Sequence, residues 1–142
     1  LLEEEHIKKS QISSSGSSSI TYILDAIDTV SAKIALAAYA DEHSIPLISS
    51  MGTGNKLHPE LFRISDLKDT SVCPLCRVMR KELKTRGIQS LKVCWSPEKP
   101  LTPAPAEEDT GSRRSTPGSI SFVPPAAGLM IAGEIVRNIC GL

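Results

Sequence analysis

The sequence predicts an α/β fold. Two observations predict it. An apolar segment at residues 22–24 runs into two acids and then into a segment with helical spacing. A second apolar run follows at residues 46–50, so the order is strand, acid, helix, strand. A carboxylate that ends a buried strand and precedes a helix is a frequent ligand position at the carboxyl edge of such sheets.

The length and composition predict one packed domain behind a flexible start. The chain has 142 residues, which is within the common size range of a single domain. Residues 1–19 pass from a charged stretch into a serine-rich run, which buries too little apolar surface to offset its ordering entropy. We therefore expect a flexible leader over residues 1–19 and a packed unit over residues 20–142.

The first elements of the packed unit have clear local signals. Apolar side chains recur at helical spacing over residues 31–43, and Thr29 or Ser31 is available as the N-cap. After the strand at residues 46–50, the Gly-Thr-Gly-Asn turn at residues 52–55 tolerates positive φ. We expect this turn to bend away from the sheet and to face a ligand.

The later elements continue the alternation. Residues 61–67 alternate as a strand, residues 73–86 carry an apolar helical stripe that ends at Gly87, and residues 91–96 form a further strand. Residues 97–117 contain prolines, acids and arginines but few apolar residues, which predicts an exposed and mobile excursion.

An apolar segment closes the chain. It runs from Pro124 or Pro125 to Cys140 and contains Gly128 and Gly133. The prolines suit a helix start, and the small residues would allow close approach to a sheet or to a neighbouring subunit.

Bulk composition excludes several classes of protein. Lysine plus arginine and aspartate plus glutamate number 16 each, so the chain is not a strongly basic nucleic-acid binder. Any RNA contact must be local. The most basic stretch lies on the predicted helix at residues 73–86, where a solvated face is favoured over an RNA contact. No segment approaches the ~20 apolar residues of a membrane span. We expect a soluble, cytoplasmic protein without a membrane partner.

Short motifs follow one known family in order. They lie at residues 24–33, 48–52, 64–67, 80–84, 98–100 and 116–124. Over roughly residues 21–142 the chain resembles the tRNA threonylcarbamoyladenosine dehydratases. These enzymes belong to the ubiquitin-activating-enzyme-like superfamily, which includes the thiamine and molybdopterin sulfur-carrier activators (ThiF and MoeB). The resemblance implies a partial Rossmann-like, adenylate-forming fold of this type, the carboxyl-terminal half.

The resemblance also implies an activity, cofactors and partners. The intact family enzyme uses ATP and Mg²⁺ to activate the carboxylate of threonylcarbamoyladenosine in tRNA, and ring closure then expels the nucleotide. It implies tRNA as the substrate and allows a homodimer. Two alternatives stay open: a non-catalytic module that docks on a full-length subunit through its last helix, and an activator of a ubiquitin-like or sulfur-carrier protein.

The same resemblance assigns candidate site residues. It implies that Asp28 lies near the ATP phosphates and helps to hold Mg²⁺, a role that suits a hard oxygen ligand at a strand end. Capping of the following helix is the alternative for Asp28. Lys33 is expected near the active site, paired with Asp28 or with an anionic substrate, unless it is an exposed helix lysine. Ala26, Ser50 and Gly52 are expected to line the nucleotide site.

Asp25 and the missing phosphate loop complete this prediction. Asp25 is a weaker candidate that is expected to support the loop after the strand. The 142 residues contain no glycine-rich phosphate loop and no Walker sequence. We therefore expect a carboxyl-terminal fragment or truncated paralogue, in which independent catalysis and ATP binding are weak or absent.

Two cysteines raise a metal or redox hypothesis. Cys73 and Cys76 have the two-residue gap of zinc sites and of redox motifs. Cys94 and Cys140 are isolated, so a second zinc-binding pair is absent and zinc is not favoured. A redox role is conceivable because a cysteine at a helix N-terminus has a lowered pKa, but buried inert thiols are the favoured interpretation.

Overall fold

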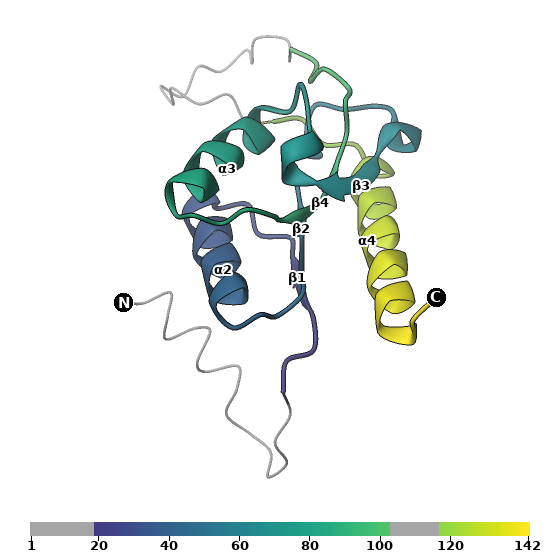
Figure 1. Ribbon diagram of the computed structural model, residues 1–142. Coiled ribbons are helices and arrows are strands. Elements are labelled where there is room, and N and C mark those ends of the chain that lie inside the picture. The colour runs from purple at the N-terminus through teal and green to yellow at the C-terminus, as the bar shows by residue number, and fades with distance from the viewer. Residues whose placement is uncertain (1–18, 103–116) are drawn as a thin grey trace.

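A four-stranded sheet with helices on both faces forms the core of the molecule (Figure 1). The computed structural model describes residues 19–102 and 117–142. The strands are β1 (Ile23–Asp25), β2 (Leu47–Ser50), β3 (Arg63–Asp66) and β4 (Lys92–Trp95). The helices are α2 (Val30–Glu42), α3 (Pro74–Thr85) and α4 (Val123–Cys140), and two short 3-10 turns, η1 (Pro59–Leu61) and η2 (Leu67–Asp69), flank β3. The predicted α/β fold is confirmed.

The sheet has the strand order β1-β2-β4-β3. Strands β1, β2 and β4 are parallel, whereas β3 is antiparallel to β4. Three strands therefore end at the same edge of the sheet, and the loops that follow β1 and β2 meet there. This edge is where open α/β sheets bind their ligands.

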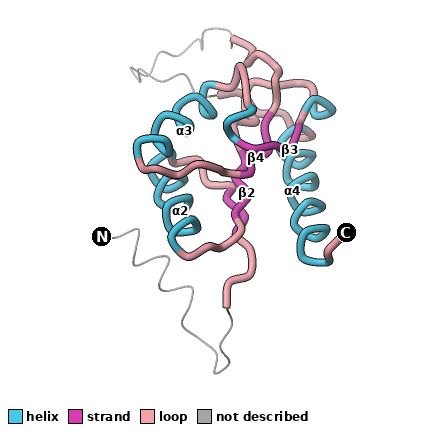
Figure 2. The backbone as a smooth tube through the Cα atoms, viewed as in Figure 1, coloured by secondary structure: helices cyan, strands magenta, loops and turns pink. Residues whose placement is uncertain are grey.

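Helices cover the sheet in two layers. Helices α2 and α3 lie on one face and α4 lies on the other, with the strands between them (Figure 2). Along β2, Leu47 belongs to the cluster under α2 and α3, and the next residue, Ile48, belongs to the cluster under α4. Val93 and Cys94 alternate in the same way on β4. Because both faces are covered, the central strands are apolar on both sides, as parallel sheets require.

Helix α3 shows why a helix could be predicted here from the spacing of apolar residues. Its buried residues Cys76, Met79 and Leu83 recur at helical spacing and face the core. Fully burying a side chain such as Met79 contributes about 1.5–3 kcal/mol. The helix ends at Thr85, and Gly87, two residues later, has a φ of +76° and donates its backbone N–H to the carbonyl oxygen of Lys84. A glycine in the left-handed region is a common helix terminator.

Some predictions fall outside the described residues. The leader is described only at residue 19, and residues 103–116 of the expected excursion are likewise outside. The strand expected at residues 61–67 is shorter in the structure, because the turns η1 and η2 occupy its two ends. Among residues 19–102 and 117–142, no helix is both long enough and apolar enough to cross a membrane.

Candidate functional site

A buried carboxylate lies at the carboxyl end of β1. Asp25 is 1% exposed and is paired with Ser49 in the register of β1 and β2. Its Oδ2 accepts hydrogen bonds from the Ser49 hydroxyl and from Lys33 Nζ, the latter at 3.0 Å. Its Oδ1 accepts the backbone N–H of Ile27 at 2.9 Å. This last bond shapes the turn after the strand, so the expectation that Asp25 supports the loop is confirmed.

Lys33 reaches this carboxylate from the first turn of α2. Its side chain is 2% exposed, and Nζ also contacts Ser49 Oγ at 3.3 Å and the Ser50 carbonyl oxygen at 2.8 Å. A lysine ammonium has three N–H groups, and all three are used here. The predicted pairing of Lys33 with Asp28 is therefore wrong, and so is the exposed-lysine alternative. The cause is burial, because a charge that is removed from water needs a partner within the same interior.

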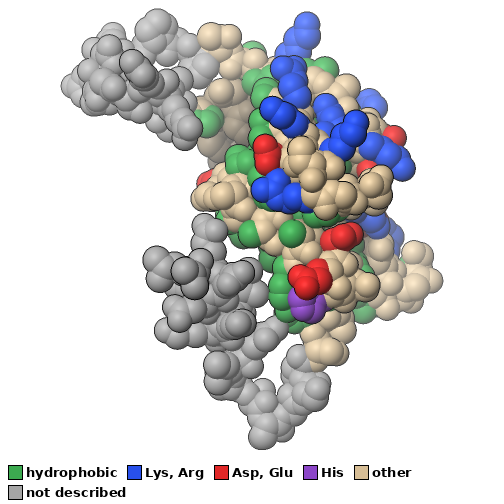
Figure 3. All heavy atoms as spheres, turned by 60° about the vertical axis from the view of Figure 1, so that its left-hand side comes forward, with side chains coloured by type: hydrophobic (Ala, Val, Ile, Leu, Met, Phe, Trp, Pro, Cys, Tyr) green, Lys and Arg blue, Asp and Glu red, His purple; other side chains and the backbone are tan. Residues whose placement is uncertain are grey.

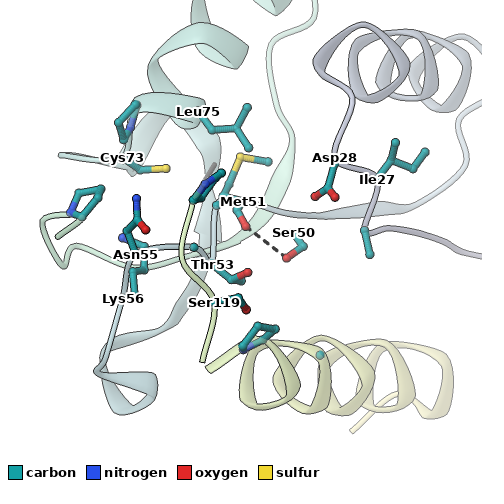
Figure 4. A pocket seen from close by; sticks show the side chains of 18 of the residues that line it. Ile27, Asp28, Ser50, Met51, Thr53, Asn55, Lys56, Cys73, Leu75 and Ser119 are labelled. Atoms are coloured by element: carbon teal, nitrogen blue, oxygen red, sulfur yellow. Dashed lines mark hydrogen bonds between the residues drawn. The ribbon is translucent and has the colours of Figure 1, made fainter. Parts of the chain in front are cut away.

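Asp28 lies beyond this network, at the rim of a cleft. Its carboxylate is exposed and makes no hydrogen bond or ion pair with any residue in the described ranges. The residue that caps α2 is Thr29, and it does so without a side-chain hydrogen bond. The capping alternative for Asp28 thus has no support in these contacts. Figure 4 shows Asp28 beside Ile27 on one side of the cleft.

The cleft has a volume of about 880 Å³ and lies at the carboxyl edge of the sheet. The loop after β1, which carries Asp28, and the loop after β2, which carries Asn55 and Lys56, both line it. Figure 4 shows Cys73, Asn55 and Lys56 on the opposite side from Asp28. Ser50 and Met51 lie between the two sides, where the Ser50 hydroxyl donates to the Met51 carbonyl oxygen at 3.4 Å.

Three helices begin at this cleft. Lining residues come from the turn before α2 (Asp28) and its first turn (Lys33), from the start of α3 (Cys73 and Pro74) and from the first turn of α4 (Pro124). Each helix N-terminus carries a partial positive charge of roughly half an elementary charge. Anionic groups are therefore favoured in the cleft even though Lys33 is neutralised by Asp25.

Asn55 joins the far wall of the cleft to a distant part of the chain. Its φ is +56°, its N–H donates to the Gly118 carbonyl oxygen, and its side-chain Oδ1 accepts the Gly118 N–H at 2.6 Å. The neighbouring Gly54 approaches Pro117 so closely that an added Cβ would lie 2.9 Å from the Pro117 Cβ. Positive φ was expected across this turn, but Asn55 is the residue that adopts it, and Gly54 is required instead for close approach.

A second buried lysine was missed by the sequence analysis. Lys56 is 4% exposed, and its Nζ donates to the Glu98 carbonyl oxygen at 2.8 Å. The Glu98 carboxylate accepts the backbone N–H groups of Leu57 and His58 at 2.9 and 3.1 Å. This reciprocal contact holds the loop after β2 against the segment after β4. Glu98 lay within a recognised motif, but no local signal indicates that Lys56 is buried.

The cysteine pair lies at the start of α3, on the cleft wall. Cys73 is the N-cap of α3 and Cys76 lies three residues later; both thiols are free and buried. A hydrogen bond from Cys76 lowers the pKa of Cys73 to about 5, and backbone N–H groups, including that of Gly52, act in the same direction against desolvation. The same contact and burial raise the pKa of Cys76 well above its usual range. Cys94 lies in the α4-side cluster and Cys140 at the end of α4, far apart in sequence from this pair.

The structure gathers the five predicted site residues around one cavity. The residues are Ala26, Asp28, Lys33, Ser50 and Gly52. Their shared position follows from topology, since loops after neighbouring parallel strands meet at one edge. Their roles in binding and catalysis stay predictions.

The basic side chains of α3 are of two kinds. Arg80 turns inward, and its guanidinium donates to the Thr70 carbonyl oxygen at 2.9 Å and to the Thr70 hydroxyl. Arg77, Lys81 and Lys84 are exposed at helical spacing. Figure 3 shows Lys and Arg side chains gathered on the upper part of the side of the molecule that it presents, where α3 lies.

Comparisons of sequence find relatives of one kind. The chain matches no protein-family model. It is 34% identical over 129 residues to the tRNA threonylcarbamoyladenosine dehydratase of Bacillus subtilis (strain 168). The aligned region covers 84% of this chain and 51% of that relative. It is 41% identical over 100 residues to tRNA threonylcarbamoyladenosine dehydratase 2 of Saccharomyces cerevisiae. The aligned region covers 66% of this chain and 22% of that relative. The chain thus spans about half the length of the Bacillus relative and less of the yeast one.

Solved structures give the same result. A structure of TcdA (CsdL) superposes with a TM-score of 0.71 at 26% identity, covering 85% of this chain and 49% of that one. The Escherichia coli tRNA N6-threonylcarbamoyladenosine dehydratase in complex with AMP superposes with a TM-score of 0.57 at 26% identity, covering 81% and 50%. The expected partial adenylate-forming fold agrees with this coverage.

Proposed function

We propose, on the premise that this chain is a homologue of the tRNA threonylcarbamoyladenosine dehydratases, that its cleft is one side of their ATP-dependent active site. In the proposed reaction the threonylcarbamoyl carboxylate on tRNA is activated by ATP. Ring closure then expels AMP and yields the cyclic nucleoside. The chain supplies the Asp28 side of this site, and the phosphate-binding loop comes from the part of the relatives outside the match.

One observation carries the proposal. A carboxylate without a partner among the described residues, Asp28, faces a cleft where three helix N-termini converge. Helix N-termini favour phosphate groups, whereas a solvated carboxylate favours a divalent cation. Both preferences in one cleft fit a nucleotide that carries its phosphates together with a metal ion.

The donor set fits Mg²⁺ at Asp28. Mg²⁺ prefers oxygen ligands and binds through one or two carboxylates together with substrate phosphates. Asp28 would hold the ion, and the Ser50 hydroxyl, which lines the same cleft, would be a further oxygen donor. When bound, the ion neutralises charge on the phosphates.

Lys33 acts in this proposal as a positioning residue. Its bond to the Ser50 carbonyl oxygen fixes the start of the loop after β2, and its pairing with Asp25 fixes the turn that carries Asp28. Lys33 therefore orients both rims of the cleft without contacting the nucleotide. Ala26 and Gly52 contribute backbone to the same two rims.

AMP release tests the proposal. The comparison uses the 142-residue chain, the full-length Bacillus subtilis relative, and a chimera in which residues 19–142 replace the matching region of that relative. Each is incubated with ATP, Mg²⁺ and threonylcarbamoyladenosine-containing tRNA. We expect tRNA-dependent AMP release and cyclic product from the chimera and much slower turnover from the chain alone, because the 142 residues carry no glycine-rich phosphate loop.

Two results would contradict this proposal. A folded chimera that releases no AMP would remove the catalytic role, and co-elution of the chain with the full-length relative would then favour the docking alternative. Turnover by the chain alone at the rate of the full-length relative would show that no second part of the site is needed.

The exposed face of α3 is the proposed tRNA contact. Arg77, Lys81 and Lys84 share one side of a helix whose first residues line the cleft. Each phosphate contact that is lost should reduce the slope of log affinity against log salt by about 0.7–0.9. Changing all three residues to glutamine should therefore weaken tRNA binding by the chain and lower this slope by about 2.

Filter binding at several salt concentrations measures this prediction. Arg63→Gln on β3 and Arg137→Gln on α4 are control variants, because both side chains are exposed and belong to other elements. An unchanged salt slope in the triple variant would assign the tRNA contact elsewhere.

A further inference from the structure

The start of α3 brings two thiols together by simple helix geometry. Cys73 is the N-cap and Cys76 is the third residue of the helix, and the side chain of an N-cap residue lies over this first turn. Two free, buried thiols therefore belong to the same first turn of α3. A bond between them needs no rearrangement of distant elements.

The backbone around Cys73 favours a reactive sulfur. Cys73 lies at the positive end of the α3 dipole, which favours a negative charge on its sulfur. The Cys76 thiol, with smaller contributions from backbone N–H groups, lowers the pKa of Cys73 to about 5, which favours the thiolate form of this sulfur. The preceding residue, Val72, has φ of +62°, which is a costly conformation for a β-branched residue. Strain of this kind is concentrated at functional positions.

The cleft gives this sulfur access to small molecules. Cys73 is only 3% exposed, but it lines the open cleft and points toward it in Figure 4. Cys76 lies behind it at 0% exposure. Cys73 on the cleft wall can therefore act as the attacking thiol, and Cys76, which does not line the cleft, as the resolving thiol.

The other two cysteines differ from this pair in their surroundings. Cys94 is packed among Ile48, Phe62 and Val123, and burial raises its pKa to about 11. Cys140 is exposed at the end of α4. Neither has a thiol neighbour among the described residues that is comparable with the Cys73–Cys76 contact.

We propose that Cys73 and Cys76 are a redox-active dithiol that converts reversibly to an intramolecular disulfide, with a low-molecular-weight disulfide as the oxidant. The Cys73 thiolate attacks one sulfur of the oxidant, whose S–S bond breaks and releases the first thiol. The Cys76 thiol then loses its proton to solvent and attacks the Cys73 sulfur. This forms the Cys73–Cys76 bond and expels the second thiol. The protein loses two electrons, and the oxidant is reduced to two thiols.

Oxidation changes the wall of the cleft. It converts the Cys73 thiolate, which lines the same cavity as Asp28, into a neutral disulfide sulfur. The modification is chemically independent of nucleotide or tRNA binding, so the proposed function can fail while this inference stands.

Equilibration with mixtures of reduced and oxidised glutathione tests the inference. The chain carries Cys140→Ser to prevent disulfides between molecules, and remaining thiols are trapped with N-ethylmaleimide and mapped by peptide mass spectrometry. We expect a Cys73–Cys76 peptide that is lighter by two hydrogen atoms to appear in a folded chain, while Cys94 stays reduced. Dithiothreitol should restore both thiols.

Single variants test the order of attack. With Cys76→Ser, Cys73 should accumulate as a mixed disulfide with glutathione, because no resolving thiol remains. With Cys73→Ser, Cys76 should stay unmodified. The inference is overturned if both thiols of the otherwise native chain stay reduced in the most oxidising mixture while circular dichroism shows an intact fold. It is also overturned if the disulfide forms only in denaturant.

Discussion

Replacing Lys33 with methionine is expected to lower the free energy of unfolding by about 3–5 kcal/mol, the range for breaking a buried ion pair by removing one partner. The Asp25 carboxylate would be left at 1% exposure with no cation. Ser49 Oγ and the Ser50 carbonyl oxygen would also lose a donor. The loss is large because an unpaired buried charge retains its desolvation penalty and loses its compensation.

Urea unfolding followed by the fluorescence of the single tryptophan, Trp95, measures this effect, since Trp95 is buried in the core. Lys68→Met, at an exposed position, is the matched control and should change stability by no more than about 0.5 kcal/mol. A double variant, Asp25→Leu with Lys33→Met, should recover part of the loss because it removes both charges. If Lys33→Met is as stable as the control, the Asp25–Lys33 ion pair does not stabilise the end of β1.

Replacing Asp28 with asparagine is expected to reduce tRNA-dependent AMP release by the chimera about 100-fold or more. Stabilisation by a metal ion contributes several kcal/mol in the transition state, and each ~1.4 kcal/mol corresponds to a tenfold change in rate. Asparagine keeps the size of the side chain but removes the charge that holds the cation. Because Asp28 is exposed and has no partner among the described residues, stability should change by less than about 0.5 kcal/mol.

Asp41→Asn is the matched control for this experiment. Asp41 is also an exposed aspartate, but it lies in the last turn of α2, whereas Asp28 precedes the N-cap of this helix at the cleft. We expect the control to retain full turnover. Equal activity of the Asp28 and Asp41 variants would exclude Asp28 as a metal ligand, and a large loss of stability in Asp28→Asn would assign it a structural role instead.

The comparison of Asp25 with Asp28 explains how far the sequence could predict the site. Two acids three residues apart end a strand, and local periodicity identifies the strand end but not which acid is buried. That is decided by Lys33 and Ser49, which reach Asp25 from a helix and from a neighbouring strand. These contacts are long-range, so no local pattern encodes them.

The helices and strands were predictable for the opposite reason. The stripe of Cys76, Met79 and Leu83 on α3 is a local signal of a buried helix face, and the end of the helix shortly before Gly87 follows from backbone sterics. The role of Arg80 was not predictable in this way. It belongs to a basic stretch, yet its guanidinium caps the turn at Thr70 because tertiary packing turns it inward.

The central claim is that Asp28 holds the metal ion of a nucleotide bound in the cleft. Paramagnetic broadening by Mn²⁺ tests it in the isotope-labelled chain, because this effect detects even weak binding. In the presence of ATP, Mn²⁺ should broaden the backbone amide signals of Ile27, Asp28 and Gly52 most strongly, and Asp28→Asn should abolish this broadening. Unchanged broadening in Asp28→Asn, or broadening centred on residues away from the cleft, would contradict the account.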